Sequence, residues 1–262
     1  MHFGSYNYTV PSVRVTLPLF KNVAILNYMF DRIRFVDPTP IYPNGVVVFD
    51  ETDIISSYVL RGLEWEPDIC ELMAQQYEPG TDVLDIGANL GLNSISMHKR
   101  VPITGTLHLF EPQPDVFTMM KHNTRHIPSR KLYNMCLGSH ASVLQFEQYH
   151  VNVGGTFMFG EGGCRNDLKI YPMTQNNMVS VAAVGLDMID LCVDRKISLV
   201  KMDVEGSEYN VLKGARKTLQ YYKPTLLIEI WSRNSEPVFE MLRSIGYSNI
   251  QHIYGEDYLC KF

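Results

Sequence analysis

VLDIGANLGLNSI, residues 83–95, is typical of a buried strand that runs into a glycine-rich turn and then directly into a helix. Such a turn lets a ligand approach bare backbone, and the helix after it presents unpaired N–H groups to that ligand. Asp85 lies at the end of the expected strand, where a polar ligand group could reach it. The stretch therefore predicts a cofactor site at the carboxyl end of a strand.

Strands and helices alternate along most of the remaining chain. The pattern predicts strands at residues 83–86, 106–110, 131–136, 198–203 and 225–230, and helices at residues 67–77, 92–99, 115–122, 207–222 and 237–244. Two short strands around a Gly-Glu-Asp turn end the chain. Such alternation predicts an α/β fold, with a parallel sheet covered by helices on both faces. Ligands of these sheets bind beyond the carboxyl ends of the strands, where the strand order reverses.

Two segments fall outside this alternation. Residues 1–65 are rich in proline, tyrosine and β-branched residues, and they contain a turn at Pro43–Gly45 followed by the short strand VVVF. They predict an N-terminal appendage packed on a main domain of residues 66–262. Residues 141–180 hold several extended stretches between glycine-rich breaks, which predicts an extended insertion. The sequence leaves three roles open for the appendage: a lid, a dimer contact or a wall of the substrate site.

Composition excludes several classes of protein. The 262-residue chain has a net charge of -5 and no long basic run, so a nucleic-acid partner is not expected. Its five cysteines are scattered, which disfavours a disulfide framework. The N-terminus lacks the pattern of a secretory signal, and the apolar stretch at residues 23–30 is too short to span a bilayer. These features predict a soluble protein of the cytoplasm without a membrane span.

The glycine spacing indicates which cofactor the turn binds. A dinucleotide site requires a middle glycine close to the pyrophosphate, but Asn89 stands there between Gly87 and Gly91, which argues against NAD or FAD. Glu111 follows Gly91 by 20 positions and ends the strand at 106–110, where a carboxylate binds ribose hydroxyls. A ligand with adenosine, no phosphates and a cationic centre satisfies both observations. S-adenosylmethionine is such a ligand.

A second group of ionisable residues lies in KMDVEGSEYNVLKGA, residues 201–215. Lys201, Asp203 and Glu205 alternate at the end of a strand, so an extended backbone would project them to one side. A third acidic residue, Glu229, ends the apolar strand TLLIEI. Stabilisation of a helix N-terminus would also explain Glu205, and a salt bridge at the rim of the sheet would explain Glu229.

Together these motifs resemble the FkbM-type family of S-adenosylmethionine-dependent class I methyltransferases. The resemblance rests on EPGTDVLDIGANLGLNSI, LFEPQP, NMCLGS, GLDMIDL and KMDVEGSEYNVLKGA, in that order. It implies a Rossmann-like, seven-stranded, mostly parallel sheet with a reversed last strand. It also implies methyl transfer to a hydroxyl group of a sugar, glycan or natural product. The cofactor-binding residues carried over from it are Asp85, Gly87, Ala88, Asn89 and Gly91 for the methionine end, Glu111 and Pro112 for the ribose, and Asn134 and Cys136 for the adenine pocket.

A hydroxyl acceptor must lose its proton as the methyl group is transferred, and a carboxylate or a metal ion can assist that step. Asp203 is the first candidate for the base or a metal ligand, Glu229 is the second, and Lys201 could favour the developing alkoxide. A divalent metal held by Asp203, Glu205 or Glu229 stays open, because no ligand spacing decides it. Two other functions are weighed: an NAD-dependent oxidoreductase, disfavoured by Asn89, and a non-catalytic module that binds a glycan or partner.

Overall fold

The computed structural model describes residues 31–147, 158–159, 178–191, 195–232 and 235–262, and residues 34–262 form one compact unit. The centre of this unit is a seven-stranded sheet with the order β12-β13-β11-β10-β3-β4-β5. Its strands are β3 (Asp82–Ile86), β4 (Leu107–Phe110), β5 (Arg130–Tyr133), β10 (Ile197–Met202), β11 (Thr225–Glu229), β12 (Asn249–Tyr254) and β13 (Asp257–Lys261).

The sheet is parallel from β5 to β11, and β13 runs antiparallel to both of its neighbours. The predicted Rossmann-like sheet with a reversed last strand is therefore confirmed. The strand order reverses between β3 and β10, so their carboxyl ends form the crevice at which such folds bind ligands. Every residue of β3, β4 and β10 is buried, as expected of central strands covered on both faces.

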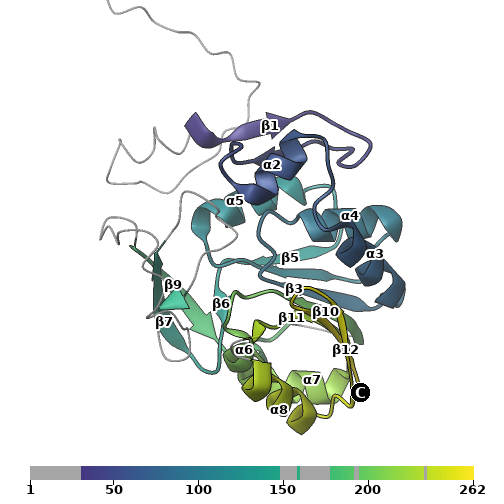
Figure 1. The fold of residues 1–262 in the computed structure, drawn as a ribbon, viewed down its shortest axis with the longest axis vertical. Coiled ribbons are helices and arrows are strands. Elements are labelled where there is room, and N and C mark those ends of the chain that lie inside the picture. Colours follow the sequence, from purple (N-terminus) through teal and green to yellow (C-terminus); the bar gives the residue numbers. More distant parts are fainter. Residues whose placement is uncertain (1–30, 148–157, 160–177, 192–194, 233–234) are drawn as a thin grey trace, which may run out of the picture. The chain divides into compact units, whose positions relative to one another are not determined.

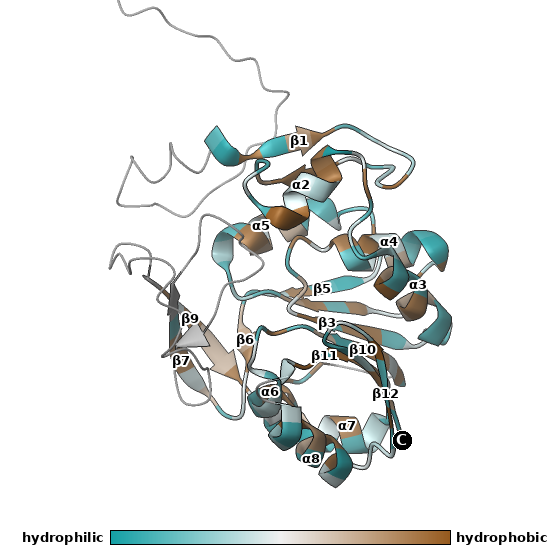
Figure 2. Ribbon diagram, viewed as in Figure 1, coloured by the Kyte–Doolittle hydropathy of each residue, from teal (hydrophilic) through white to brown (hydrophobic). Residues whose placement is uncertain are grey.

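Helices cover both faces of the sheet, as predicted (Figure 1). One side holds α3 (Pro67–Gln76), α4 (Leu92–Arg100) and α5 (Pro114–Asn123). The other side holds α6 (Glu208–Gly214), α7 (Arg216–Tyr222) and α8 (Ser235–Ile245). Figure 2 shows hydrophobic colour along the central strands and mixed colour on the helices, which is typical of amphipathic helices packed on a buried sheet.

The alternation of side chains along the strands assigns each face its chemistry. Leu84, Val200 and Ile228, from β3, β10 and β11, join the apolar core that includes residues of α6, α7 and α8. Successive side chains of a strand point to opposite faces. Asp85 and Lys201, which are partners in the β3–β10 register, therefore lie on the face of α3 and α4.

The strand predicted at residues 131–136 is wrong in its second half. β5 ends at Tyr133, and Cys136 belongs to β6 (Cys136–Leu137), a strand of a separate four-stranded sheet. The chain turns between the two strands, where the Asn134 side chain donates hydrogen bonds to the carbonyl oxygens of Glu111 and Pro112, at 2.9 and 3.0 Å. These bonds hold the loop after β4 against the loop after β5.

The helix predicted at residues 207–222 is two helices, α6 and α7, that meet at Ala215. The break has a cause that is remote in sequence. The Asp187 carboxylate accepts hydrogen bonds from the backbone N–H groups of Lys217 and Thr218, at 2.9 and 2.8 Å, and so stabilises a new helix start.

The second sheet contains the described part of the predicted insertion. Its order is β6-β9-β7-β8, with β7 (Ser142–Glu147), β8 (Met158–Phe159) and β9 (Met178–Val184). β7 pairs antiparallel with both β8 and β9, so the expected extended segments are confirmed where the structure describes them. The rest of the 141–180 insertion, including most of GGTFMFG, lies outside the described residues.

Residues 34–65 contain the predicted strand after the Pro43–Gly45 turn, β2 (Val46–Val48), together with β1 (Arg34–Val36) and α2 (Ile54–Leu60). β2 is fully buried and contacts α5. The domain boundary at residue 65 stays a prediction, and residues 1–30 lie outside the described part of the chain. Within the described part, no helix has the length and apolar character needed to cross a bilayer.

Asn123 joins β2 to the rest of the unit, and its replacement by alanine tests that role. Its side chain accepts from the N–H of Val47 at 2.6 Å and donates to the carbonyls of Val47 and Leu90 at 2.9 and 3.0 Å. Asn123→Ala leaves these buried groups without partners. We therefore expect the free energy of unfolding, measured in urea, to fall by about 2–3 kcal/mol. Lys121→Ala, at an exposed position of α5, is the control and should be nearly neutral. Equal losses in both variants would contradict this role.

Candidate active site

The glycine turn, residues 87–91, adopts a left-handed backbone at three positions: Gly87 (φ 80°), Asn89 (φ 50°) and Gly91 (φ 78°). Glycine is required at position 87 for a second reason. A Cβ atom there would lie 1.7 Å from the carbonyl oxygen of Asp203. The loops that follow β3 and β10 are therefore in direct backbone contact.

Each backbone N–H group of this turn donates to an acceptor within the protein, and binding of a ligand by these groups stays a prediction. The N–H groups of Gly87 and Ala88 donate to the carbonyl of Phe110, at 3.0 and 2.9 Å. The N–H of Leu90 donates to the Asn89 side-chain oxygen at 2.8 Å, and the N–H of Gly91 donates to the carbonyl of Ala88. The turn therefore provides room for a ligand, together with carbonyl oxygens that can accept hydrogen bonds from it.

Glu111, at the end of β4, is held by the same turn. One carboxylate oxygen accepts from the N–H of Asn89 at 3.0 Å, and the other accepts from the N–H of Gln113 at 2.8 Å. Burial raises the pKa of Glu111 to about 7, although these two hydrogen bonds act in the opposite direction. Each oxygen keeps one lone pair, so the carboxylate can still accept two ligand hydroxyl groups.

A pocket joins the glycine turn, Glu111 and the loop after β10. The pocket has an empty volume of about 590 Å³, which includes space that is open to solvent. The pocket is lined by Ile86, Gly87, Asn89, Phe110, Glu111, Pro112, Gln113, Met135, Cys136, Leu137, Asp203, Val204 and Glu205. It therefore brings together residues predicted for the methionine end, the ribose, the adenine and the acidic group. Asn134 is exposed and stands outside this lining, because its side chain is bound to the backbone of the β4 loop.

A buried charge cluster lies next to this pocket, and Asp203 belongs to both. The Lys201 ammonium lies 3.4 Å from an Asp203 carboxylate oxygen. Burial alone would lower the pKa of Lys201, but the surrounding carboxylates, Asp203 first, outweigh it and hold the pKa above its usual range. Asp85 is 1% exposed, and its Oδ2 accepts from the Ser94 hydroxyl at 2.6 Å. Burial raises the pKa of Asp85, while the charge of Lys201 opposes that effect.

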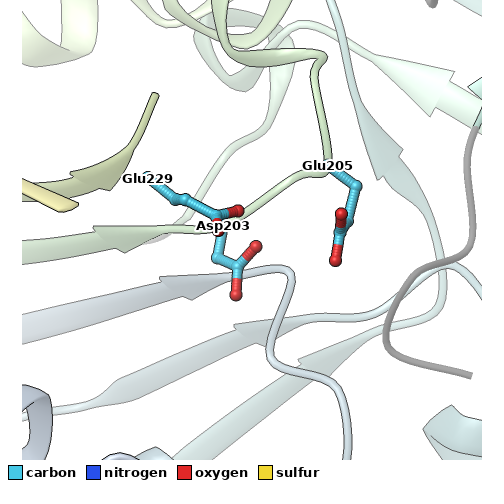
Figure 3. A group of neighbouring side chains, drawn as sticks. All are labelled: Asp203, Glu205 and Glu229. Carbon is cyan, nitrogen blue, oxygen red and sulfur yellow. The ribbon is translucent and has the colours of Figure 1, made fainter. Parts of the chain in front are cut away.

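Asp203, Glu205 and Glu229 form a group that we name the acidic triad, and each offers a carboxylate oxygen within 4.8 Å of the other two. Figure 3 shows Glu229 reaching from its strand toward Asp203, while Glu205 descends from the following loop. Burial, then the charge of Asp203, raises the pKa of Glu205 to about 9 and that of Glu229 to about 8. Such a group can take up a proton or hold a hard cation.

Two acidic residues of this region were not predicted from the sequence. Asp257 begins β13 and pairs with Glu229 across the antiparallel ladder; burial, then the charge of Glu66, raises its pKa to about 6. Glu66 precedes α3, and the charges of Lys201, Asp203 and Asp85 all act on it. The Gly-Glu-Asp turn was the available signal for Asp257, whereas no local pattern marked Glu66.

Most of the chain matches one known protein family. Residues 85–249, more than half of the 262-residue chain, match the family described as the methyltransferase FkbM domain. The chain belongs to the FkbM methyltransferase family. This family implies S-adenosylmethionine as the methyl donor, which agrees with the resemblance seen in the sequence.

Two curated relatives are similar to this chain over part of their length. Hexuronic acid methyltransferase AglP of Haloferax volcanii is 25% identical over 162 residues, which cover 62% of this chain and 61% of that protein. Methyltransferase 1 of Beauveria bassiana is 26% identical over 146 residues, covering 50% of this chain and 57% of that protein. The chain thus spans about three fifths of the length of these relatives.

Solved structures were compared as well. A methyltransferase FkbM from Methylobacillus flagellatus aligns with a TM-score of 0.47 at 14% identity, covering 92% of this chain and 59% of that one. An S-adenosylmethionine-dependent O-methyltransferase from Thermotoga maritima aligns with a TM-score of 0.47 at 10% identity, covering 90% and 79%.

The residues of the pocket fit S-adenosylmethionine. Glu111 can accept from ribose hydroxyls, and apolar side chains such as Met135 and Leu137 offer an adenine ring a dry wall. Asp85 lies outside the pocket lining, in the charge cluster next to it, and its fully buried Oδ1 has no hydrogen-bond partner among the residues that the structure describes. A cationic group of the ligand would satisfy that oxygen.

The backbone contact at Gly87 can be tested against a matched glycine. Gly87→Ala adds a Cβ that collides with the carbonyl of Asp203, whereas Gly80→Ala adds one at a similar φ of 86° with nothing within 4 Å. Because both variants carry the left-handed strain of about 1–3 kcal/mol, only the collision distinguishes them. We expect the melting temperature of Gly87→Ala to fall clearly further than that of Gly80→Ala. Equal shifts would show that the loops can separate without cost.

The acidic triad should make the ligand-free protein less stable at high pH. A carboxyl group whose pKa is raised in the folded state stabilises folding below its unfolded pKa of about 4.3 and loses that effect as pH rises through its folded pKa. The pKa of Glu205 is about 9, so Glu205→Gln should raise the melting temperature at pH 9 by about 2–4 °C and change it little at pH 5. Thermal unfolding at both pH values measures this. Glu240→Gln, at an exposed position of α8, is the control; a gain that does not depend on pH would contradict the assignment.

Proposed function

We propose that this chain is an S-adenosylmethionine-dependent O-methyltransferase whose acceptor is a hydroxyl group of a sugar or glycan. One observation carries the proposal: the acidic triad adjoins the pocket that contains Glu111. A hydroxyl oxygen is a poor nucleophile until it loses its proton, and carboxylates at the end of the cofactor site can accept that proton. The 25% identity to hexuronic acid methyltransferase AglP supports a sugar as the substrate class.

Position and charge divide the roles within the triad. Burial, then the charge of Asp203, raises the pKa of Glu229 to about 8, which favours a protonated carboxyl group that shares a hydrogen bond with Asp203. Asp203 lines the pocket, so we assign it as the group that receives the acceptor's proton. Lys201 is buried beneath it, with its ammonium 3.4 Å from the carboxylate, and so it acts on the acceptor through Asp203 rather than by direct contact.

The remaining residues position the reactants. Bound S-adenosylmethionine would supply an electrophilic methyl group. Glu111 would bind the ribose, the glycine turn would hold the methionine end, and Asp85 would bind the ammonium of that end, as the sequence led us to expect. Fixing both partners removes much of the entropic barrier to an in-line displacement. The triad also meets the requirements of a divalent cation, which would lower the pKa of the acceptor hydroxyl.

Methyl transfer to defined acceptors tests this function. The protein is incubated with S-adenosylmethionine and, separately, with neutral, acidic and amino sugars, their oligosaccharides and a hydroxylated polyketide, and each methylated product is analysed for O-methyl groups by mass spectrometry. We expect Asp203→Asn to lower turnover by about 100-fold or more and to leave the affinity for S-adenosylhomocysteine close to that of the wild type. Glu240→Gln should retain full activity. Wild-type turnover by Asp203→Asn would show that the assigned base is wrong.

Two further arms separate the alternatives. If EDTA removes activity and Mg²⁺ restores it, the triad acts as a ligand set for a cation; activity that resists EDTA favours Asp203 as a simple base. Thermal stabilisation by S-adenosylhomocysteine but not by NADH supports the methyltransferase over an oxidoreductase. Tight binding of a glycan without any methyl transfer would favour a binding module instead.

A further inference from the structure

Backbone strain is concentrated around the active site. Among the described residues, those other than glycine with positive φ are Glu66, Asn89, Glu205 and Lys223. Lys223 ends α7, where a left-handed residue is common. Asn89 and Glu205 line the pocket. Strained backbone persists where the surrounding structure enforces it, and it often marks a functional residue.

Glu66 is the member of this set that neither lines the pocket nor ends a helix. It precedes Pro67, and a residue before proline normally favours an extended backbone, yet its φ is 46°. It occupies the N-cap position of α3, but its side chain makes no capping hydrogen bond there. The carbonyl of Glu66 accepts the first hydrogen bond of the helix, from the N–H of Cys70 at 3.0 Å, while its side chain is directed elsewhere.

The Glu66 carboxylate is held by the helix that follows the glycine turn. The Asn93 side-chain amide donates to Glu66 Oε2 at 2.9 Å. The next residue, Ser94, donates its hydroxyl to Asp85 Oδ2 at 2.6 Å. Two consecutive residues in the first turn of α4 thus bind two carboxylates, one from β3 and one from the segment before α3. Glu66 therefore belongs to the same buried cluster as Asp85, the residue that the sequence predicts for the methionine end of the cofactor.

The charges at this place do not balance. Among the described residues, the positive charge of Lys201 acts on both Glu66 and Asp85, and Lys201 forms an ion pair with Asp203. Burial raises the pKa of Glu66, and the negative charges of Asp203 and Asp85 add to that effect. Oδ1 of Asp85 is fully buried and has no partner within the described residues. A second cationic donor would relieve both the charge excess and the unpartnered oxygen.

We propose that Glu66, together with Oδ1 of Asp85, binds the α-ammonium group of the cofactor's methionine end. The inference rests on the S-adenosylmethionine dependence of the proposed function and adds a residue from outside the glycine turn. The strained backbone at position 66 has a function in this view, because it directs a carboxylate toward the ligand. Glu66 is thus a cofactor-binding residue that determines recognition of the amino-acid end.

Two ligands that differ at the amino-acid end test this proposal by calorimetry. S-adenosylhomocysteine carries the ammonium group, whereas 5′-methylthioadenosine keeps the adenosine and sulfur but lacks the amino acid. Glu66→Gln preserves the shape of the side chain and removes its charge, so we expect about tenfold weaker binding of S-adenosylhomocysteine and unchanged binding of methylthioadenosine. Equal weakening of both ligands, or of neither, would overturn the proposal.

Glycine variants provide a second measurement that a purely structural role would not reproduce. Glu66→Gly removes the strain and a buried charge, so its melting temperature should rise by about 2 °C or more while its affinity for S-adenosylhomocysteine falls. Lys223→Gly removes the same kind of strain at an exposed helix end and should gain stability without any change in affinity. If Glu66→Gly loses stability and binds both ligands less well, Glu66 is structural. If the wild type does not bind S-adenosylhomocysteine, the proposed cofactor dependence fails, not the assignment of Glu66.

Discussion

The structure of the site depends on the backbone contact between the glycine turn and the end of β10. The N–H of Asp203 donates to the carbonyl of Ile86 at 3.0 Å, and a Cβ at Gly87 would collide with the carbonyl of Asp203. This contact extends the β3–β10 pairing one step beyond the strands. It places the acidic triad beside Glu111, which the same turn holds through the N–H of Asn89. Residues predicted for the cofactor and candidate catalytic residues thus line one pocket.

The sequence predicted this site wherever a local pattern placed a residue at a strand end. Glu111 and Asp203 follow parallel strands, and the carboxyl ends of such strands meet at one edge of a sheet, so their proximity follows from strand assignment alone. Asp257 required knowledge of the antiparallel register that sets it opposite Glu229. Glu66 required a left-handed backbone before a proline, which residue preferences disfavour. Neither position could be inferred from spacing.

The errors in the fold have the same origin. Periodicity over residues 207–222 is compatible with one helix, and only the Asp187 carboxylate, from a segment remote in sequence, provides a start for a second one. The strand predicted at residues 131–136 ends early because Asn134 bonds to the loop after β4, and Cys136 then joins a different sheet. In both cases a side chain from one segment satisfies backbone groups of another, and local propensity contains no information about such bonds.

The ligand-free site combines two unfavourable features, strained backbone and crowded carboxyl groups. Glu111, Glu205 and Glu229 have pKa values of about 7, 9 and 8, because burial and mutual repulsion disfavour their charged forms. Left-handed backbone at Glu66 and Glu205 adds to this cost. Neither feature improves packing, so both lower the stability of the empty protein. A cationic ligand would interact favourably with these crowded carboxyl groups, so the stability lost at the site would be recovered as affinity.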